Sequence, residues 1–303
     1  MTPRTGSGDI LHALRKVKHR AFLTRRAVSR TARRSIDTGY RVYDRALPYR
    51  FDPETHRDRY GSYPRMYFLH RYAPQYERIQ EEVPRRIFAF WTGENALSAN
   101  RERCLREMRQ VHDDLEIVLV TPENLNSWVL EEFPLHPAYR HLSLIHRSDY
   151  LRAYFMAHHG GGYADIKTPT HSWSAAFDAL QASPDTWLAG YPERSSRSCG
   201  GDDYTRLGRD IHRHYGSLVG FGGFIMRGRT PFGYEWMQEL NRRLDYFHEE
   251  LAQHPGGVWG DTPGYPLRWV DVGSDVFHPL QLKYLQHVTQ REDILPVLAG
   301  GHR

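Results

Sequence analysis

This chain of 303 residues has little cysteine and no long apolar run. Its two cysteines, Cys104 and Cys199, fit neither a disulfide framework nor a zinc site, so we expect them to be structural or neutral. No stretch approaches the ~20 apolar residues that span a bilayer, and no signal-peptide core follows Met1. The sequence therefore predicts a cytoplasmic protein without a transmembrane segment.

Positive charge is concentrated in the first part of the chain. Residues 1–50 hold 13 Lys plus Arg against 3 Asp plus Glu, a net charge of +10, which leaves −5 of the total +5 on the other 253 residues. From Ile10 to Ile36, apolar residues recur at three-, four- or seven-residue spacing, with arginine and lysine between them. This pattern predicts a basic amphipathic helical arm in which residues 1–36 bind an anionic membrane surface, with about 1 kcal/mol from each basic residue.

Two other interpretations of the arm stay open, a solvated tail and a nucleic-acid-binding segment. Nucleic acid is disfavoured because the basic residues are not interleaved with aromatic residues on which bases could stack. Residues 51–82 follow as a linker, rich in Tyr, Arg, Pro and His, that we expect to pack on the body. Residues 83–303 form the predicted catalytic domain.

Strand and helix patterns alternate along this domain, which has no internal repeats. Buried strands are predicted at 83–91, 115–120, 187–191 and 218–227. Ser98, Thr121 and Thr230 are predicted to cap helices, the latter two with proline at the first helical position. Strands that alternate with helices indicate an α/β fold with a mostly parallel central sheet flanked by helices.

The segment Arg147–Lys167, RSDYLRAYFMAHHGGGYADIK, is the most specific part of the chain. Ser148 is predicted to cap a helix, and Asp149 and Arg152 then lie one turn apart near its start. A triple glycine supplies the positive-φ positions that end helices, and the short strand that follows presents Asp165 at its end. The charged pair and the strand-end carboxylate are therefore expected to face one crevice.

This segment resembles the glycosyltransferases with a DXD sugar-binding region, which include capsular polysaccharide synthesis enzymes and outer-chain mannosyltransferases. Their pattern is Ser-Asp, two or three apolar residues, Arg, a helix, Gly-Gly, an aromatic residue, one further residue and Asp-x-Asp. Ser148 to Arg152 and Gly161 to Asp165 match it in order and spacing, but Lys167 replaces the second aspartate. The order of elements resembles the family from Val83 to His278, which implies a GT-A-like nucleotide-binding fold.

The resemblance implies roles for single residues. Asp149 and Arg152 would grip donor-sugar hydroxyls, Asp165 would contact ribose or sugar, and Trp91 would stack on the nucleobase. Gly161, Gly162 and Tyr163 belong to the same substrate-binding segment. The structural alternatives are an ordinary surface ion pair for Asp149 and Arg152 and core packing for Trp91 and Tyr163.

A nucleotide-sugar leaves a diphosphate, so the site must stabilise negative charge as the anomeric bond breaks. Most enzymes of this fold use Mn²⁺ or Mg²⁺ held by the DXD carboxylates. Two versions fit this chain: Asp165 holds a metal with His278, or the Lys167 ammonium replaces the metal. The second is favoured slightly, because a carboxylate beside a cation makes a poor divalent site, so a metal cofactor is doubtful.

The resulting hypothesis is an enzyme that transfers a hexose from a nucleotide-sugar to a cell-surface polysaccharide or its lipid-linked precursor. The family resemblance implies that the configuration at the anomeric carbon is retained. It would act on the inner face of the plasma membrane as a peripheral protein. The alternative is a catalytically inactive relative that serves as a binding or scaffold protein in polysaccharide assembly, to which the Lys167 substitution gives weight.

Overall fold

The computed structural model describes residues 31–52, 69 and 78–297. In this part of the chain, six strands form one mixed sheet in the order β2-β1-β3-β5-β4-β6. β1 pairs in parallel with β2 and β3, and β4 with β6, whereas β5 is antiparallel to both β3 and β4. The predicted α/β fold with a mostly parallel sheet is therefore confirmed, with β5 as its reversed strand. The strands are β1 (Arg86–Phe90), β2 (Glu116–Val120), β3 (Gly161–Ala164), β4 (Leu188–Pro192), β5 (Val219–Met226) and β6 (Val288–Gln290).

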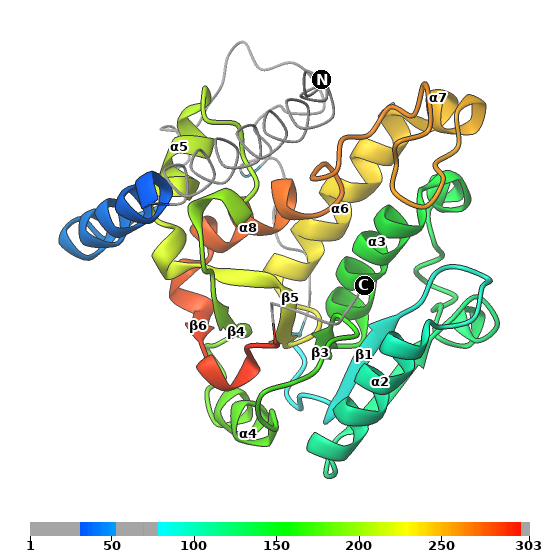
Figure 1. Ribbon diagram of the computed structural model, residues 1–303, viewed down its shortest axis with the longest axis horizontal. Helices are drawn as coiled ribbons and strands as arrows, with labels where there is room; N and C mark the ends of the chain where they lie inside the picture. The colour runs from blue at the N-terminus through cyan, green and yellow to red at the C-terminus, as the bar shows by residue number, and fades with distance from the viewer. Residues whose placement is uncertain (1–30, 53–68, 70–77, 298–303) are drawn as a thin grey trace, which may run out of the picture.

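Helices cover both faces of the sheet (Figure 1). Side chains alternate along β1, so Phe88 and Phe90 pack toward α3, α6 and α8, while Ile87 and Ala89 pack toward α2 and α4. The result is a three-layer domain with two hydrophobic cores. Besides the helical residues 31–46, the described α-helices are α2 (Ala99–Val111), α3 (Leu144–His158), α4 (Ser174–Gln181), α5 (Arg206–Arg213), α6 (Pro231–Tyr246), α7 (His248–Gln253) and α8 (Ser274–Lys283).

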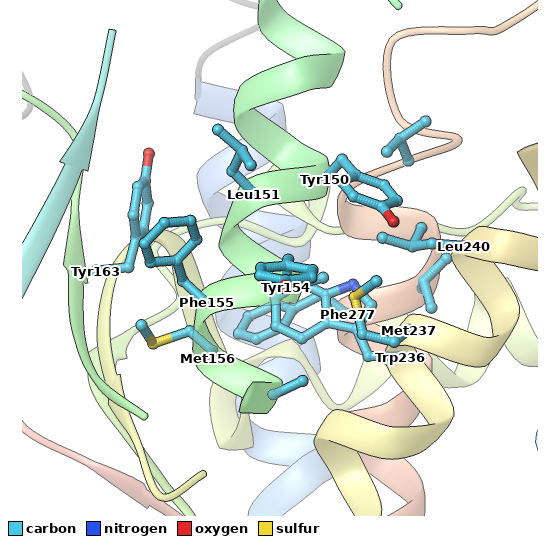
Figure 2. Packing of buried hydrophobic residues seen from close by; sticks show 14 of the residues in the cluster. Tyr150, Leu151, Tyr154, Phe155, Met156, Tyr163, Trp236, Met237, Leu240 and Phe277 are labelled. Carbon is cyan, nitrogen blue, oxygen red and sulfur yellow. The ribbon is translucent and has the colours of Figure 1, made fainter. Parts of the chain in front are cut away.

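The larger core lies between α3, α6 and α8 (Figure 2). Tyr154 and Phe155 of α3 pack in one cluster with Trp236 of α6 and Phe277 of α8, and all four side chains are almost wholly buried. Burial of each large apolar side chain contributes about 1.5–3 kcal/mol. This packing holds α3, which carries Asp149, firmly against the sheet.

Helix α3 begins earlier than its sequence pattern suggests. Ser143, not Ser148, is the N-cap, and its hydroxyl accepts a hydrogen bond from the backbone N–H of His146. The predicted cap was wrong because both serines suit the position, and distant contacts fix the helix start at Ser143: its N–H donates to the Tyr265 hydroxyl, and the N–H of the next residue, Leu144, donates to the Gly257 carbonyl. Asp149 therefore lies in the second turn, and α3 is buried on most of its circumference rather than along one stripe.

The helix predicted after Thr121-Pro122 is also absent from the structure, which describes this whole segment. The chain turns there into a single 3-10 turn, Leu125–Ser127. The Asn124 side chain accepts from the Thr121 N–H and donates to the Leu119 carbonyl, so it closes a turn instead of allowing a helix to start. The other described 3-10 segments are Pro137–His141, Ser196–Ser198, Tyr215–Ser217, Leu285–His287 and Glu292–Ile294.

Other predicted helix ends agree with the structure. Ser98 caps α2 and Thr230 caps α6, each by accepting a backbone N–H, although a break at Phe247 separates α6 from α7. Gly160 and Gly161 end α3 with φ of 68° and 92°, conformations that favour glycine. They turn the chain directly into β3.

The described part of the N-terminal arm is attached to the body. Residues 31–46 are helical, and Asp37 accepts hydrogen bonds from Ser195 and Ser196. Asp44 is buried and pairs with His214 at 2.6 Å. Most of the predicted membrane-binding segment, residues 1–30, and most of the predicted linker lie outside the described residues. Among the helices that the structure does describe, none has the length and hydropathy needed to cross a bilayer.

Candidate functional site

A cavity of about 310 Å³ lies at the carboxyl ends of β3 and β4. These strands run in the same direction, because each is antiparallel to β5, so the residues that follow them reach one edge of the sheet. Ligands of open α/β sheets bind at such edges. Six charged side chains, together with polar, aromatic and small residues, line the cavity: Ile145, Asp149, Arg152, Asp165, Lys167, Tyr191, Glu193, Arg194, Ser198, Phe221, Gly222, Trp269 and Ser274.

Arg152 lies at the centre of this arrangement. Its Nη2 is 3.3 Å from Asp149 Oδ1 and 3.4 Å from Asp165 Oδ1, and Nη1 donates to the Phe221 carbonyl at 3.2 Å. The guanidinium lies 4.5 Å from the ring centre of Tyr163 and 4.4 Å from that of Phe221. Burial opposes its charge, but neighbouring negative groups outweigh that cost and raise the pKa of Arg152. A permanent positive charge is therefore held in place by both rings and carboxylates.

Asp165 is bound by three side chains. Lys167 Nζ donates to Oδ2 at 2.7 Å, while Tyr163 Oη donates to Oδ1 at 2.5 Å and Arg152 lies on the same oxygen. Burial alone would raise the pKa of this carboxyl, but Arg152 and Lys167 outweigh burial and lower it. Asp165 is therefore held ionised.

Asp149 has the opposite electrostatic balance. Its carboxyl is buried, and burial raises its pKa despite the nearby Arg152. Two carboxylates that share one arginine thus differ in their affinity for a proton, and Asp149 is the one better suited to exchange a proton or a hydrogen bond with a ligand.

The other predicted site residues fall into two groups. Tyr163 is buried and positions Asp165 through its hydroxyl. Gly161 and Gly162 lie in β3, where an added Cβ would approach Arg86 O to 2.9 Å or the side chain of Ile87 to 3.1 Å. They allow close strand packing and are not part of the cavity wall. Trp91 is also outside this wall, and its Nε1 donates to the carbonyl of Asn95 at 2.6 Å.

Sequence reasoning missed most of the other residues of the wall, among them Glu193, Arg194, Phe221 and Trp269. Glu193 and Arg194 directly follow β4, so the position of a charged pair after a predicted strand was an available signal. Burial raises the pKa of Glu193, although its Oε1 accepts backbone hydrogen bonds at 2.6 and 3.4 Å. Phe221 and Trp269 had no comparable signal.

The residues around Asp165 do not fit a divalent metal. One of its oxygens accepts from Lys167 and the other from Tyr163, and Arg152 lies beside it. A metal there would meet two fixed positive charges and would have to displace existing donors. His278, the predicted second ligand, is not part of the cavity wall.

His278 belongs instead to a buried group with Glu193 and Cys199, whose potential ligand atoms lie within 4.8 Å of one another. Its Nδ1 accepts the N–H of Gly200 at 2.9 Å, so in the neutral ring the proton is on Nε2. Nε2 is the atom that faces Glu193, at 3.9 Å, and a protonated nitrogen cannot bind a metal. Burial lowers the pKa of His278 to about 3 and raises that of the Cys199 thiol, which places a neutral imidazole and a neutral thiol there.

Comparison with known proteins gives one match. Residues 67–168 match a family model described as capsular polysaccharide synthesis protein, which is about a third of the chain. This range contains Asp149, Arg152, Asp165 and Lys167. The match supports a relation to this capsule-related family and a role in polysaccharide biosynthesis. No curated protein and no solved structure matches the chain.

Proposed function

We propose that this protein is a glycosyltransferase that moves a hexose from a nucleotide-sugar to a cell-surface polysaccharide or its lipid-linked precursor. The observation that carries the proposal is the convergence of Asp149, Arg152, Asp165 and Lys167 on one cavity at the carboxyl ends of the strands. The family match to capsular polysaccharide synthesis supports the substrate class.

Cations in the wall suit a diphosphate. Lys167 presents an ammonium with 18% of its side chain exposed, and it is one of only four lysines in the chain. Arg194 lies on the same wall and is oriented by Glu292 at 2.6 Å. In this proposal both stabilise the negative charge that develops on the leaving phosphate, the role that a divalent metal plays elsewhere.

The acidic side of the cavity suits the sugar. Asp149 is set to exchange hydrogen bonds with hydroxyl groups, while Arg152 and Asp165 hold each other in a fixed orientation. In the reaction, the bond between the anomeric carbon and the phosphate oxygen breaks, and its electron pair leaves with the nucleoside diphosphate. The acceptor oxygen bonds to the anomeric carbon, and its proton passes to a phosphate oxygen of the leaving group, as the retaining chemistry of the resembled family requires no separate base.

The test is a panel of nucleotide-sugars, assayed for hydrolysis and thermal stabilisation with and without Mn²⁺. Asp149→Ala, Arg152→Ala and Asp165→Ala should each lower turnover at least about tenfold, a loss of ~1.4 kcal/mol of transition-state stabilisation. A cooperative unfolding transition in each variant would exclude simple misfolding. Full activity of Asp165→Ala would contradict the assignment.

An inactive binding protein is the second candidate, and the Lys167–Asp165 ion pair favours it. In this pair Lys167 binds the Asp165 carboxylate, which corresponds to a metal-binding carboxylate in the family motif. A wild-type protein that binds no nucleotide-sugar with or without Mn²⁺, yet binds a capsular polysaccharide, would establish this role instead.

A peripheral location on the inner face of the plasma membrane is part of the proposal. The helical residues 31–46 and the next turn expose Ile36, Val42 and Leu47 by 52%, 62% and 58% beside Arg33, Arg34 and Arg45. Apolar side chains among arginines suit the interface of an anionic bilayer, where a lipid-linked acceptor would be found.

A further inference from the structure

Two neighbouring tryptophans, one of them in the cavity wall, expose most of their surface. Trp269 lines the cavity and is 58% exposed, and Trp259 is 60% exposed. Their rings are nearly parallel, at 16°, with centroids 6.4 Å apart. Large aromatic side chains dominate the energetics of binding surfaces when a ligand covers them. The pair therefore extends the charged cavity outward as an aromatic surface.

The segment that carries these rings is firmly built. The Gly256 N–H donates to the His141 carbonyl at 2.9 Å, and the N–H groups of Leu144 and Ile145 donate to the carbonyls of Gly257 and Val258 at 3.0 and 3.3 Å. The first turn of α3 is thus hydrogen-bonded to the residue before Trp259. The same helix carries Asp149 and Arg152, so the rings and the charged groups share one frame.

The other end of the segment is fixed by charge. Arg268, the neighbour of Trp269, is 2.8 Å from carboxylate oxygens of Asp271 and Asp275 and 3.3 Å from Asp202. Such a cluster of hydrogen-bonded charges restricts the backbone on which Trp269 stands. The two large rings are therefore exposed to solvent on a backbone that hydrogen bonds hold in place, and this favours a role in ligand binding.

The size of the cavity indicates which substrate meets these rings. About 310 Å³ is at the lower end of the ~300–1,000 Å³ typical of ligand sites, so a nucleotide-sugar would fill it. The second substrate must then approach from the mouth, where Trp269 forms part of the wall.

We infer that Trp259 and Trp269 form the binding platform for the carbohydrate of the acceptor. The C–H face of a pyranose ring stacks on the electron-rich face of an indole, and its hydroxyls stay in contact with polar groups at the rim. Asp261, two residues beyond Trp259, is exposed and gives this surface a carboxylate, which hydrocarbon would disfavour and sugar hydroxyls can bind. This inference rests on the proposed function, because it assigns the acceptor to the same site.

The test is calorimetric titration of the full chain with short linear oligosaccharides of the glucan, mannan and galactan series. Trp259→Ala should weaken binding of at least one series at least about tenfold, and Trp259→Phe should keep most of the affinity. Because Trp259 is outside the cavity wall, nucleotide-sugar binding should stay within about twofold of the wild type in Trp259→Ala. The Trp259→Ala/Trp269→Ala protein should lose oligosaccharide binding altogether. Tyr246→Ala, which removes an exposed aromatic ring of α6, is the matched control and should bind as the wild type does.

Equal oligosaccharide affinity in the wild type and the double variant, or no binding to any series, would overturn the inference. Binding to anionic phosphatidylglycerol vesicles that is lost in the double variant, with oligosaccharide binding unchanged, would replace it with a membrane contact. Absence of nucleotide-sugar binding in the wild type, with tryptophan-dependent oligosaccharide binding intact, would reject the proposed transferase while supporting the platform.

Discussion

At the scale of residues, Lys167 distinguishes the metal-independent version of the proposed reaction from the metal-dependent one. Its ammonium holds Asp165 at 2.7 Å in the place where the resembled family has a metal-binding carboxylate. We expect wild-type activity to survive EDTA, and Lys167→Ala to lower kcat by ~10²-fold or more, as loss of one charge-stabilising donor does elsewhere. Kinetics in EDTA and in Mn²⁺ measure both effects.

Changing Lys167 to Asp provides the complementary experiment. This substitution restores the DXD pattern and should make any recovered activity depend on Mn²⁺. If EDTA abolishes wild-type activity and His278→Ala reproduces that loss, the metal version with Asp165 and His278 is correct and the role assigned to Lys167 is wrong.

Glu193 offers a second residue-scale prediction, based on its raised pKa. A carboxyl with a higher pKa in the folded state than in the unfolded state contributes stability at low pH that is lost as pH rises through the folded pKa. Glu193→Gln keeps an oxygen for the backbone donors and removes the charge, so its melting temperature relative to the wild type should increase between pH 5 and pH 8. Scanning calorimetry at both pH values measures this, with the exposed Glu131→Gln as control. A difference that is constant with pH would contradict the prediction.

At the scale of elements, the arm helix supports one wall of the cavity. Asp37 receives hydrogen bonds from both Ser195 and Ser196, in the segment that continues from Glu193 to Ser198 of the wall. Asp37→Ala should therefore destabilise the fold by ~1–3 kcal/mol and also weaken nucleotide-sugar binding. Denaturant unfolding and calorimetric titration measure the two effects.

Asp44 is the matched control for this element. It is buried against His214 and Ser217, which belong to a different contact of the same helix and are not part of the cavity wall. Asp44→Ala should reduce stability without changing the affinity for the donor. Equal loss of donor affinity in both variants would show that the helix acts only through overall stability.

At the scale of the whole molecule, the buried His278 and the partly buried His158 predict sensitivity to acid. Burial lowers the pKa of His278 to about 3 and that of His158 to about 4. The unfolded state takes up these protons near pH 6.5, so stability present above that pH is lost as pH falls toward the folded values. As the pH falls from 7 to 5, each of these two histidines should lower the free energy of unfolding by about 2 kcal/mol. His278→Gln keeps an acceptor for the Gly200 N–H. Urea titrations should show that this variant loses less stability than the wild type when the pH is lowered from 7 to 5. An equal loss of stability in the two proteins would refute the prediction.

The asymmetry of charge leads to the second whole-molecule prediction. Removal of residues 1–34 should leave activity on a soluble acceptor analogue intact but abolish salt-sensitive binding to anionic liposomes, because that attraction is screened over about 8 Å at physiological salt. Asp37 and Asp44 remain in this shortened chain. If it still sediments with the vesicles, another surface is the anchor.

The sequence by itself determined the local unit that joins Asp149, Arg152, Asp165 and Lys167. A helix, a glycine turn and a short strand bring these residues together over a short range of chain, so their spacing and residue types were sufficient. The helix caps at Ser98 and Thr230 could likewise be predicted from the sequence, because capping depends on residues that are close in the chain.

Only the tertiary structure decided which residues complete the cavity. Glu193, Phe221 and Trp269 reach it because β5 reverses direction between β3 and β4 and because the loop before α8 bonds to the start of α3. These are contacts between distant segments, which periodicity does not encode. The same holds for the cap of α3, which is Ser143 and not Ser148. Local propensity favours both serines equally, and the bonds of Ser143 to Tyr265 and of Leu144 to Gly257 select between them.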